Sequence, residues 1–445
     1  MKKIIPLIFL VLLYAGSCVQ SIDGTGYPLD KSRKWTFIVY MAADNNLESA
    51  AIADFNELEA VNLAGQPVSI LVLFDRCPGF DATNGDWTDT RLYEIKTDPG
   101  GNNATIVSKR LDCPELGLTA ASDTELSMSD PLVLSHLLEY AQRVYRADNY
   151  GLLVWGHGTG WRGSGGGGSV PEPVKAVAID DTYGGYMSLK SFGGAISGKG
   201  LSVVGFDTCF GAILEAAYQI KDSAEYLVAS EGVIPSTGWD YRSLFNVFLN
   251  NYASSGLPPS GFCDAVISQY SAQYGGTSNA TISKINLTKV NDLFTAFEQF
   301  ALVLANNITT VTLRDSVRNA ILTGPAIDRY YDSSFPSNLY IDIESFGAAM
   351  PSLITAANAT ALQSALNAAV PSSWSQAYGT SRRSLGIYVI DLVSDGAAAS
   401  THEPGYIKGS PSMDKSAFVE NSNSWTPHSS PVSTSFLDKL FYWVF

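Results

Sequence analysis

Two residues with reactive side chains follow apolar runs of the kind that form buried strands. His157 lies in GHGTGW, directly after the run 151–155, and Cys209 lies in DTCFGA, directly after the run 201–206. The carboxyl ends of parallel strands meet at one edge of a sheet, so neighbouring strands would make the imidazole and the thiol face one crevice. A thiol beside an imidazole is a nucleophile with its acid/base partner, and this pair predicts attack on a substrate carbonyl.

Each of these residues also has a structural interpretation when taken alone. A lone cysteine after a strand is most often a small buried hydrophobe, and a lone histidine is often a hydrogen-bonded core residue. The chain has only four histidines, however, and His157 stands between glycines at a strand end equivalent to that of Cys209. The equivalent positions of His157 and Cys209 therefore favour a catalytic role over two separate structural roles. Serine hydrolase chemistry is disfavoured because no G-x-S-x-G occurs in the chain.

The neighbours of His157 and Cys209 predict further parts of a site. The glycines beside His157 leave room for a substrate carbonyl, and we expect the backbone N–H groups of Gly158 and Cys209 to form an oxyanion hole. The run 212–220 has helical spacing, which predicts that the thiol lies near a helix N-terminus that stabilises thiolate. Asp207 would share the crevice with Cys209 if the strand stayed extended. Alternatively, Asp207 caps that helix or braces a loop.

The elements that position these residues follow from the periodicity of the sequence. Apolar runs that predict buried strands alternate with helical spacing over about 200 residues, which is the pattern of a parallel α/β sheet. The predicted strands are 35–41, 68–74, 91–95, 151–155, 176–179, 201–206 and 226–229. After residue 257 the segments 260–274, 288–306 and 361–370 are predicted to be helical, and 385–390 is predicted to be one more strand.

Length and charge exclude several classes of protein. The chain has 445 residues, a formal net charge of −15 and 46% hydrophobic residues, which excludes a disordered chain, a collagen-like repeat and a small disulfide scaffold. No basic block is present, so a nucleic-acid partner is not expected. Cationic substrates fit the acidic balance better.

The N-terminal residues predict export. Residues 1–17 combine two lysines, an apolar run and small residues, the pattern of a secretory signal, and Cys18 follows as in the lipobox of bacterial lipoproteins. We therefore predict a lipoprotein signal peptide at 1–17, lipidation of Cys18 and a polar tether at 18–33. This makes the protein an exported bacterial lipoprotein of the cell envelope or cell surface. The alternative is an ordinary signal peptide followed by an incidental cysteine.

The spacing of the other cysteines identifies neither a disulfide nor a metal site. A disulfide between Cys77 and Cys113 is conceivable in an oxidising compartment, but spacing alone does not assign it. No CxxC or paired-histidine spacing indicates a metal site, so the metal ligands, if any, are unknown from sequence.

Four segments together resemble the clostripain-like cysteine peptidases, relatives of caspases, gingipains and legumain. The segments are FIVYMAADNNLE at 37–48, LLVWGHGTGW at 152–161, GFDTCFGAILE at 205–215 and ASEGVIPSTGWDY at 229–241. The resemblance implies a caspase-like three-layer α/β/α sandwich with a mostly parallel sheet and a C-terminal, largely helical extension. It implies a peptidase core at 34–255, and a C-terminal subdomain at 256–445 that contributes the strand 385–390 and an irregular tail.

The resemblance also implies roles for particular residues. The residue that matches Cys209 is the nucleophile of that family, the one that matches His157 is the general acid/base, and the one that matches Asp207 is associated with an acidic S1 pocket. Cleavage after Arg or Lys, self-processing between the histidine and the cysteine, and calcium dependence in some members are implied as well. Arg162 and Lys175 flank a glycine-rich stretch of that loop and are candidate processing positions.

Two functions remain open at this point. The first is a lipid-anchored bacterial cysteine endopeptidase that cleaves protein or peptide substrates after basic residues and needs no cofactor for its chemistry. The second is a non-catalytic surface lipoprotein that binds peptides or glycans in the same crevice. The sequence does not identify the physiological substrate, the membrane face, a calcium requirement or a zymogen state.

Overall fold

A computed structural model describes most of the chain. The described residues are 33–121, 123–160, 177–276, 279–332, 335–389, 406, 408–409, 416–429 and 434–441. The predicted signal peptide, Cys18 and the tether up to residue 32 lie outside these residues, as do Arg162 and Lys175.

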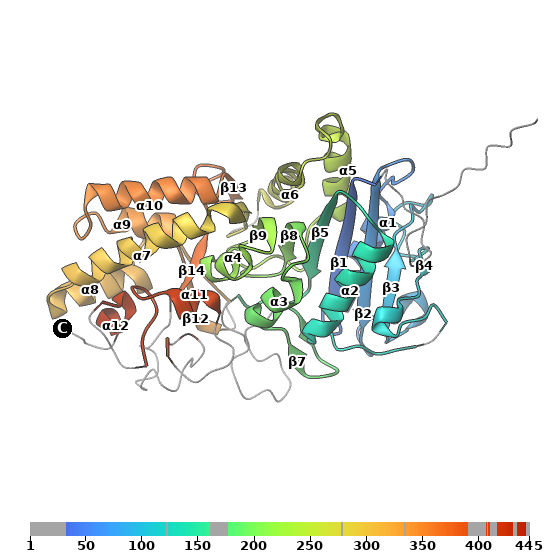
Figure 1. Cartoon of the computed structure of the whole chain (residues 1–445), viewed down its shortest axis with the longest axis horizontal. Helices are drawn as coiled ribbons and strands as arrows, with labels where there is room; N and C mark the ends of the chain where they lie inside the picture. The colour runs from blue at the N-terminus through green and yellow to red at the C-terminus, as the bar shows by residue number, and fades with distance from the viewer. Residues whose placement is uncertain are drawn as a thin grey trace, which may run out of the picture.

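A central sheet of nine strands organises the fold (Figure 1). Its order is β13-β10-β9-β8-β5-β1-β2-β3-β4. The pairs of β1 with β2, β1 with β5, β5 with β8 and β8 with β9 are parallel, whereas both ends of the sheet are antiparallel. The strands are β1 (Trp35–Ala43), β2 (Val68–Arg76), β3 (Thr90–Glu94), β4 (Lys109–Arg110), β5 (Asn149–Trp155), β8 (Leu201–Asp207), β9 (Ala224–Ala229), β10 (Thr281–Asn286) and β13 (Ser372–Ser375).

The central strands form where the sequence is continuously apolar. All nine residues of β1 are buried, and so are all nine residues of β2, because helices cover both faces of the sheet. Alternate residues of β1 enter different cores: Phe37 packs on one face and Ile38 on the other. The parallel centre that the apolar runs predict is therefore confirmed.

Helices on the two faces make the three layers of a caspase-like sandwich. On one face lie α1 (Glu48–Glu59), α5 (Tyr241–Asn251) and α6 (Pro259–Tyr274), and on the other lie α2 (Pro131–Val144), α3 (Leu189–Ile196) and α4 (Leu214–Ile220). The N-cap of α2 is Asp130, whose side chain accepts the N–H of Leu132, and Pro131 occupies the first helical position.

The C-terminal half adds helices at one end of the sheet and a second sheet (Figure 1). The helices are α7 (Val290–Asn307), α8 (Val311–Leu322), α9 (Ile343–Ala349), α10 (Ala356–Ala369), α11 (Ala417–Asn421) and α12 (Phe436–Phe441). The second sheet contains β11 (Arg329–Asp332), β12 (Phe335–Asp342) and β14 (Gly386–Val389). Short 3₁₀ helices are η1 (Thr83–Gly85), η2 (Pro114–Leu116), η3 (Ala253–Ser255) and η4 (Leu287–Lys289). No helix of the described residues is long and apolar enough to span a membrane.

Three predicted features of the sheet differ in the structure. The run 176–179 is predicted to be a buried strand, but of its described residues 177–179 only Ile179 enters a strand, and β6 (Ile179–Asp180) pairs with β7 (Gly185–Tyr186) in a separate hairpin. The predicted strand 385–390 exists as β14 but joins β12 in the second sheet. Strands β10 and β13 extend the central sheet from beyond residue 255 and were not predicted. The division of the chain into domains at that residue stays a prediction.

Glu215 joins the central sandwich to the second sheet. This residue of α4 is fully buried, and its Oε1 accepts the backbone N–H of Tyr388 at 2.9 Å and the hydroxyl of Tyr406 at 2.8 Å. Burial raises the pKa of the Glu215 carboxyl to about 7, and the hydrogen bonds oppose that rise. The folded protein therefore retains a proton on Glu215 at pH values where the unfolded chain has lost it.

This difference predicts a pH-dependent free energy of unfolding. The stability that the bound proton contributes is complete below the unfolded pKa, about 4.3, and is lost as pH rises through the folded value of about 7. Glu215→Gln should make the decline in melting temperature between about pH 5 and pH 8 shallower, as measured by calorimetry. The exposed Glu225→Gln should keep the parent slope. Parallel curves for the parent and Glu215→Gln would contradict the assignment.

Candidate active site

His157 and Cys209 leave neighbouring strands at the same edge of the sheet. β5 and β8 are parallel neighbours, and Trp155 stands opposite Asp207 at their carboxyl ends. The two loops then touch at Gly158: a Cβ there would lie 2.5 Å from the Thr208 side chain and 2.7 Å from the carbonyl oxygen of Cys209. The prediction that the two strands are neighbours is confirmed.

The imidazole of His157 has a partner that the sequence did not predict. Its Nε2 lies 2.6 Å from the side-chain Oδ1 of Asn46, an exposed residue in the turn after β1. An amide Oδ1 only accepts hydrogen bonds, so this contact places a proton on Nε2 and leaves the lone pair of the neutral ring on Nδ1. Asn46 is therefore suited to orient the imidazole. The sequence feature that could have pointed to Asn46 is its position in the turn directly after a buried strand, at the sheet edge where His157 also lies.

The thiol of Cys209 differs from the other cysteines in its access to solvent. Cys209 is partly exposed, and its sulfur accepts the N–H of Ile234 at 3.3 Å. Cys77, Cys113 and Cys263 are buried, and burial raises the pKa of the first two to about 12 and of the third still further. All four are free thiols, so the conceivable disulfide between Cys77 and Cys113 is not formed.

The prediction that Cys209 lies near a helix N-terminus is wrong. Helix α4 begins at Leu214, and Cys209 lies in a loop whose next residue, Phe210, has a φ of 56°. Because the field of a helix end falls off within one turn, α4 does not stabilise the thiolate as predicted. Contacts of the Phe210 side chain stabilise the left-handed backbone conformation of this residue. Its ring stacks on Tyr340 at 5.0 Å, and the Tyr340 hydroxyl donates to the carbonyl of Thr159 at 2.9 Å.

Gly158 has a structural reason to be glycine that was not anticipated. Its missing Cβ accommodates Thr208 and the backbone of Cys209 rather than open space. The glycine therefore fixes how closely the two loops approach. Its part in an oxyanion hole, together with the N–H of Cys209, stays a prediction.

Asp207 is the last residue of β8 and is buried. Only 4% of its surface is exposed, and its Oδ2 accepts the N–H of Trp239 and the hydroxyl of Tyr241, both at 3.0 Å. Burial raises the pKa of its carboxyl to about 7. Asp207 braces the segment around Gly238 and does not cap α4, whose N-cap is Ile213. Its membership of an S1 pocket stays a prediction.

A second acidic group lies beside Asp207. A Cβ added to Gly238 would lie 2.9 Å from Oδ2 of Asp207 and 2.9 Å from Oδ2 of Asp54. The Asp54 oxygen also accepts the indole N–H of Trp155 at 2.6 Å. Burial raises the pKa of Asp54 well above its ordinary value, and the charge of Asp207 adds to the rise. The two carboxyls thus form an acidic pair beneath the Gly238 backbone.

Three further buried carboxylates meet near the ends of β1 and β2. Asp44, Asp75 and Asp180 each offer a carboxylate oxygen, and these oxygens lie within 4.8 Å of one another. Oxygen donors of this kind suit a hard cation such as Ca²⁺. Spacing did not reveal the group because its members come from three distant segments of the chain.

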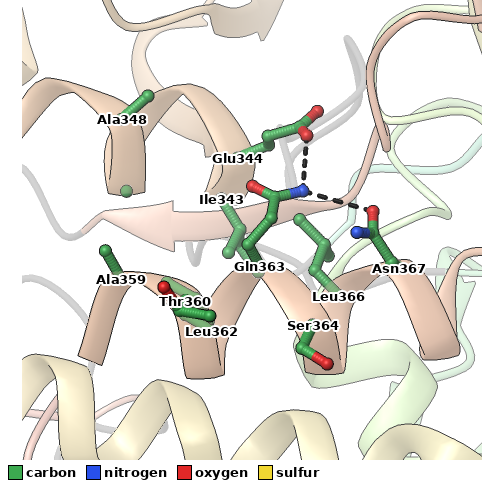
Figure 2. Close-up of a pocket in the computed structure, with 11 residues that line it drawn as sticks. Ile343, Glu344, Ala348, Ala359, Thr360, Leu362, Gln363, Ser364, Leu366 and Asn367 are labelled. Atoms are coloured by element: carbon green, nitrogen blue, oxygen red, sulfur yellow. Dashed lines mark hydrogen bonds between the residues drawn. The ribbon is translucent and has the colours of Figure 1, made fainter. Parts of the chain in front are cut away.

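A groove of about 470 Å³ lies between α9 and α10, on the C-terminal part (Figure 2). Gln363 reaches across it, donating to Glu344 at 2.6 Å and to Asn367 at 3.2 Å. Glu344 also accepts the N–H of Arg383. The residues that line this groove include no thiol or imidazole, so it is not the reacting site.

The fold and the paired side chains define the class of this protein. A caspase-like α/β/α sandwich carries a partly exposed thiol and an imidazole on adjacent strand ends, an arrangement that can pair a nucleophile with an acid/base group. The model of the clostripain family matches residues 39–385. The chain therefore belongs to the clostripain family, and the match extends well beyond the region in which the sequence resemblance was strong.

Individual relatives agree with this membership. Clostripain of Hathewaya histolytica is 30% identical over 238 residues, which cover 49% of this chain and 42% of that protein. The chain thus aligns with less than half the length of this relative. An inactive zymogen C11 protease from Parabacteroides distasonis has a TM-score of 0.57 at 18% identity, covering 81% of this chain and 93% of that one. A secreted C11 cysteine protease from Bacteroides thetaiotaomicron, in complex with an irreversible peptide inhibitor, has a TM-score of 0.58 at 19% identity, covering 84% and 96%.

The contact between Asn46 and His157 predicts a positioning role for Asn46. Asn46→Ala should lower kcat for a peptide substrate by about 100-fold, because a displaced imidazole transfers protons poorly. It should leave the melting temperature nearly unchanged because Asn46 is exposed. Asn46→Asp keeps an acceptor for Nε2–H, so this variant should have most of the parent kcat. The added negative charge favours the imidazolium, so the apparent pKa of the acidic limb of the pH–rate profile should rise.

The matched control is Asn62→Ala, which removes an exposed asparagine whose hydrogen bond is local. It should leave both kcat and the pH–rate profile unchanged. Equal kinetics for Asn46→Ala and Asn62→Ala would show that Asn46 does not position His157.

Proposed function

We propose that this protein is a cysteine endopeptidase with Cys209 as the nucleophile and His157 as the general acid/base. The observation that carries the proposal is that the partly exposed thiol of Cys209 and the imidazole of His157 leave adjacent parallel strands through touching loops. Membership of the clostripain family supports the same chemistry. The protein would act on protein or peptide substrates.

The reaction proceeds in two stages. Nδ1 of His157 takes the thiol proton of Cys209. The resulting thiolate attacks the scissile carbonyl carbon, and the N–H groups of Gly158 and Cys209 stabilise the oxyanion that forms. His157 donates its proton to the leaving amine, the C–N bond breaks, and a thioester remains on Cys209. His157 then takes a proton from water, whose oxygen attacks the thioester. The C–S bond breaks and His157 returns the proton to sulfur, which releases the acid and the free thiol.

Asn46 keeps the imidazole ready for both stages. Its Oδ1 accepts the Nε2 proton, which leaves Nδ1 as the nitrogen that exchanges a proton with the reacting groups. The hydrogen bond also stabilises the imidazolium form. A nucleophile, a base and an orienting third group together follow the general logic of covalent catalysis.

The dyad predicts the loss of activity in two single variants. Cys209→Ala and His157→Ala should each reduce hydrolysis of a lysyl or arginyl reporter peptide by at least about 1,000-fold. Their melting temperatures should remain close to the parent value. The control is Ser268→Ala, at an exposed position of α6, and unchanged activity is expected.

A fully active His157→Ala or Cys209→Ala would contradict the proposal. No hydrolysis by the folded parent protein would favour the alternative, a non-catalytic lipoprotein that binds peptides or glycans. Loss of fold in parallel with loss of activity would assign both residues a structural role.

We further propose that Asp207 makes the enzyme prefer Arg or Lys at the cleaved position. The support is its carboxyl, which lies two residues before the nucleophile and beside that of Asp54, in a buried setting with no basic partner among the described residues. A desolvated carboxylate strongly favours a cationic side chain because any other leaves its charge unpaired. The match of Asp207 to the family position supports the same role.

This preference predicts a change of specificity in one variant. Asp207→Asn should lower kcat/KM for lysyl and arginyl substrates by about 100-fold or more, while the amide oxygen still accepts the Trp239 and Tyr241 hydrogen bonds. Asp342→Asn is the matched control, because Asp342 is also fully buried and caps the distant α9. Unchanged preference for basic residues in Asp207→Asn would remove the pocket assignment.

Export, lipidation and self-processing complete the proposal. Residues 1–18 carry the signal and lipobox pattern, and the relative from Bacteroides thetaiotaomicron is described as secreted. We propose anchoring through a lipid on Cys18, and cleavage after Arg162 or Lys175 as the activation step. The zymogen described for the Parabacteroides distasonis relative supports activation by processing.

A further inference from the structure

One tyrosine of the second sheet contacts both loops that carry His157 and Cys209. Tyr340 belongs to β12 and is fully buried. Its hydroxyl donates to the carbonyl of Thr159, two residues after His157, at 2.9 Å. Its ring stacks on Phe210, the residue after Cys209, with ring centroids 5.0 Å apart and an interplanar angle of 22°. A single side chain therefore joins the His157 loop to the Cys209 loop.

The contacts of Tyr340 leave little space at this junction. Gly160 has a φ of 62°, and a Cβ added there would lie 2.6 Å from the Tyr340 hydroxyl oxygen and 2.8 Å from Cβ of Phe210. The backbone of the His157 loop thus lies directly against the tyrosine and the phenylalanine. Any side chain at residue 160 would push the loop and the tyrosine apart.

Phe210 needs these contacts because its backbone conformation is unfavourable. Its φ of 56° lies in the left-handed region, which a bulky residue adopts only where its surroundings hold it there. The N–H of Phe210 donates to the carbonyl of Gly232 at 3.0 Å, and the ring lies on Tyr340. Loss of the tyrosine ring would remove one of these restraints from the residue that directly follows Cys209.

Tyr340 is itself held by the second sheet. β12 pairs antiparallel with β14, where Tyr340 stands opposite Tyr388, and the centroids of their rings lie 5.4 Å apart. The N–H of Gly386 in β14 donates to the carbonyl of Ala212 at 2.9 Å, which ties this sheet to the end of the Cys209 loop. The tyrosine therefore approaches the two loops from a strand that is anchored to the central sandwich.

We propose that Tyr340 is a positioning residue that holds His157 and Cys209 at the spacing their reaction requires. This inference rests on the proposed function, in which the two side chains react together. Proton transfer between them requires hydrogen-bond reach, and a misplacement of about 1 Å can reduce the rate about 100-fold. Asn46 orients the imidazole directly, whereas Tyr340 acts on the loops from a strand 181 residues beyond Thr159 in the chain.

Two variants separate the two contacts of Tyr340. Tyr340→Phe keeps the ring but removes the hydrogen bond to Thr159, so it should lower kcat for a lysyl reporter peptide about fivefold. Tyr340→Leu also removes the stacking on Phe210, so it should lower kcat about 50-fold or more. KM should change by less than about threefold in both variants, because the buried Tyr340 does not touch the substrate.

The matched controls are Tyr218→Phe and Tyr218→Leu. Tyr218 of α4 is also buried, and its ring packs on Phe294 at a centroid distance of 4.4 Å, in a contact that involves neither loop. These variants should lower the melting temperature about as much as the Tyr340 variants do, but they should keep the parent kcat. Equal kcat values for the corresponding Tyr340 and Tyr218 variants would overturn the proposal.

A double-mutant cycle distinguishes positioning from a general loosening of the fold. Alkylation of Cys209 by iodoacetamide is followed by mass spectrometry in the parent, Tyr340→Leu, His157→Ala and the double variant. Tyr340→Leu should slow alkylation about tenfold in the parent but less than about twofold in the His157→Ala background, because the pair is already broken there. If Tyr340→Leu does not fold, Tyr340→Phe takes its place, with about threefold slowing expected in the parent only.

Two outcomes of the cycle would overturn the proposal, and they differ in what else they contradict. Equal slowing in both backgrounds would show that Tyr340 does not act through the pair, and the proposed peptidase function would stand. An alkylation rate that His157→Ala leaves unchanged would contradict the proposed pairing of His157 with Cys209, and with it the role of Tyr340.

Discussion

The parallel pairing of β5 with β1 and with β8 is the constraint on which the site depends. Strands that run in the same direction end at the same edge, so the turn after β1, the loop after β5 and the loop after β8 converge there. Asn46, His157 and Cys209 belong to these three connections. Gly158 sets the spacing, since any side chain would push the His157 loop away from Cys209. The continuous apolar strands hold this edge rigid enough for chemistry.

Several buried carboxylates also lie at this edge of the sheet, and such groups are uncommon in a hydrophobic core. Asp207 lies beside Asp54, and a second group of carboxylates lies at the ends of β1 and β2. Buried carboxylates favour protonation or a bound cation, so their burial costs stability unless a ligand compensates. The side chain proposed to pair with the first group is a cation. The strong negative charge of the chain, −15, fits this pattern.

How far the sequence predicted the structure depended on the length and type of each signal. The long apolar runs of β1, β2, β5 and β8 predicted the centre of the sheet, and the positions of His157 and Cys209 after β5 and β8 predicted that the two residues leave neighbouring strands. Asn46 and the carboxylate cluster escaped because their partners lie far away in the chain. Strand β10 escaped because Lys284, which pairs with Asp264, interrupts its apolar pattern. Helix α4 begins later than its periodicity indicated because Ile213 bridges to Gly386 in extended conformation.

If Cys209 is the nucleophile, it should be the one cysteine of this chain that reacts with a substrate-like electrophile. The most direct measurement is mass spectrometry of the intact protein and its peptides after incubation with an irreversible peptidyl ketone inhibitor that ends in lysine. The predicted result is one adduct per chain, on Cys209, which His157→Ala slows strongly and Asn46→Ala slows less. An adduct on Cys77, Cys113 or Cys263, or no adduct at all on a folded and processed protein, would contradict the assignment of Cys209 and His157 as the catalytic pair.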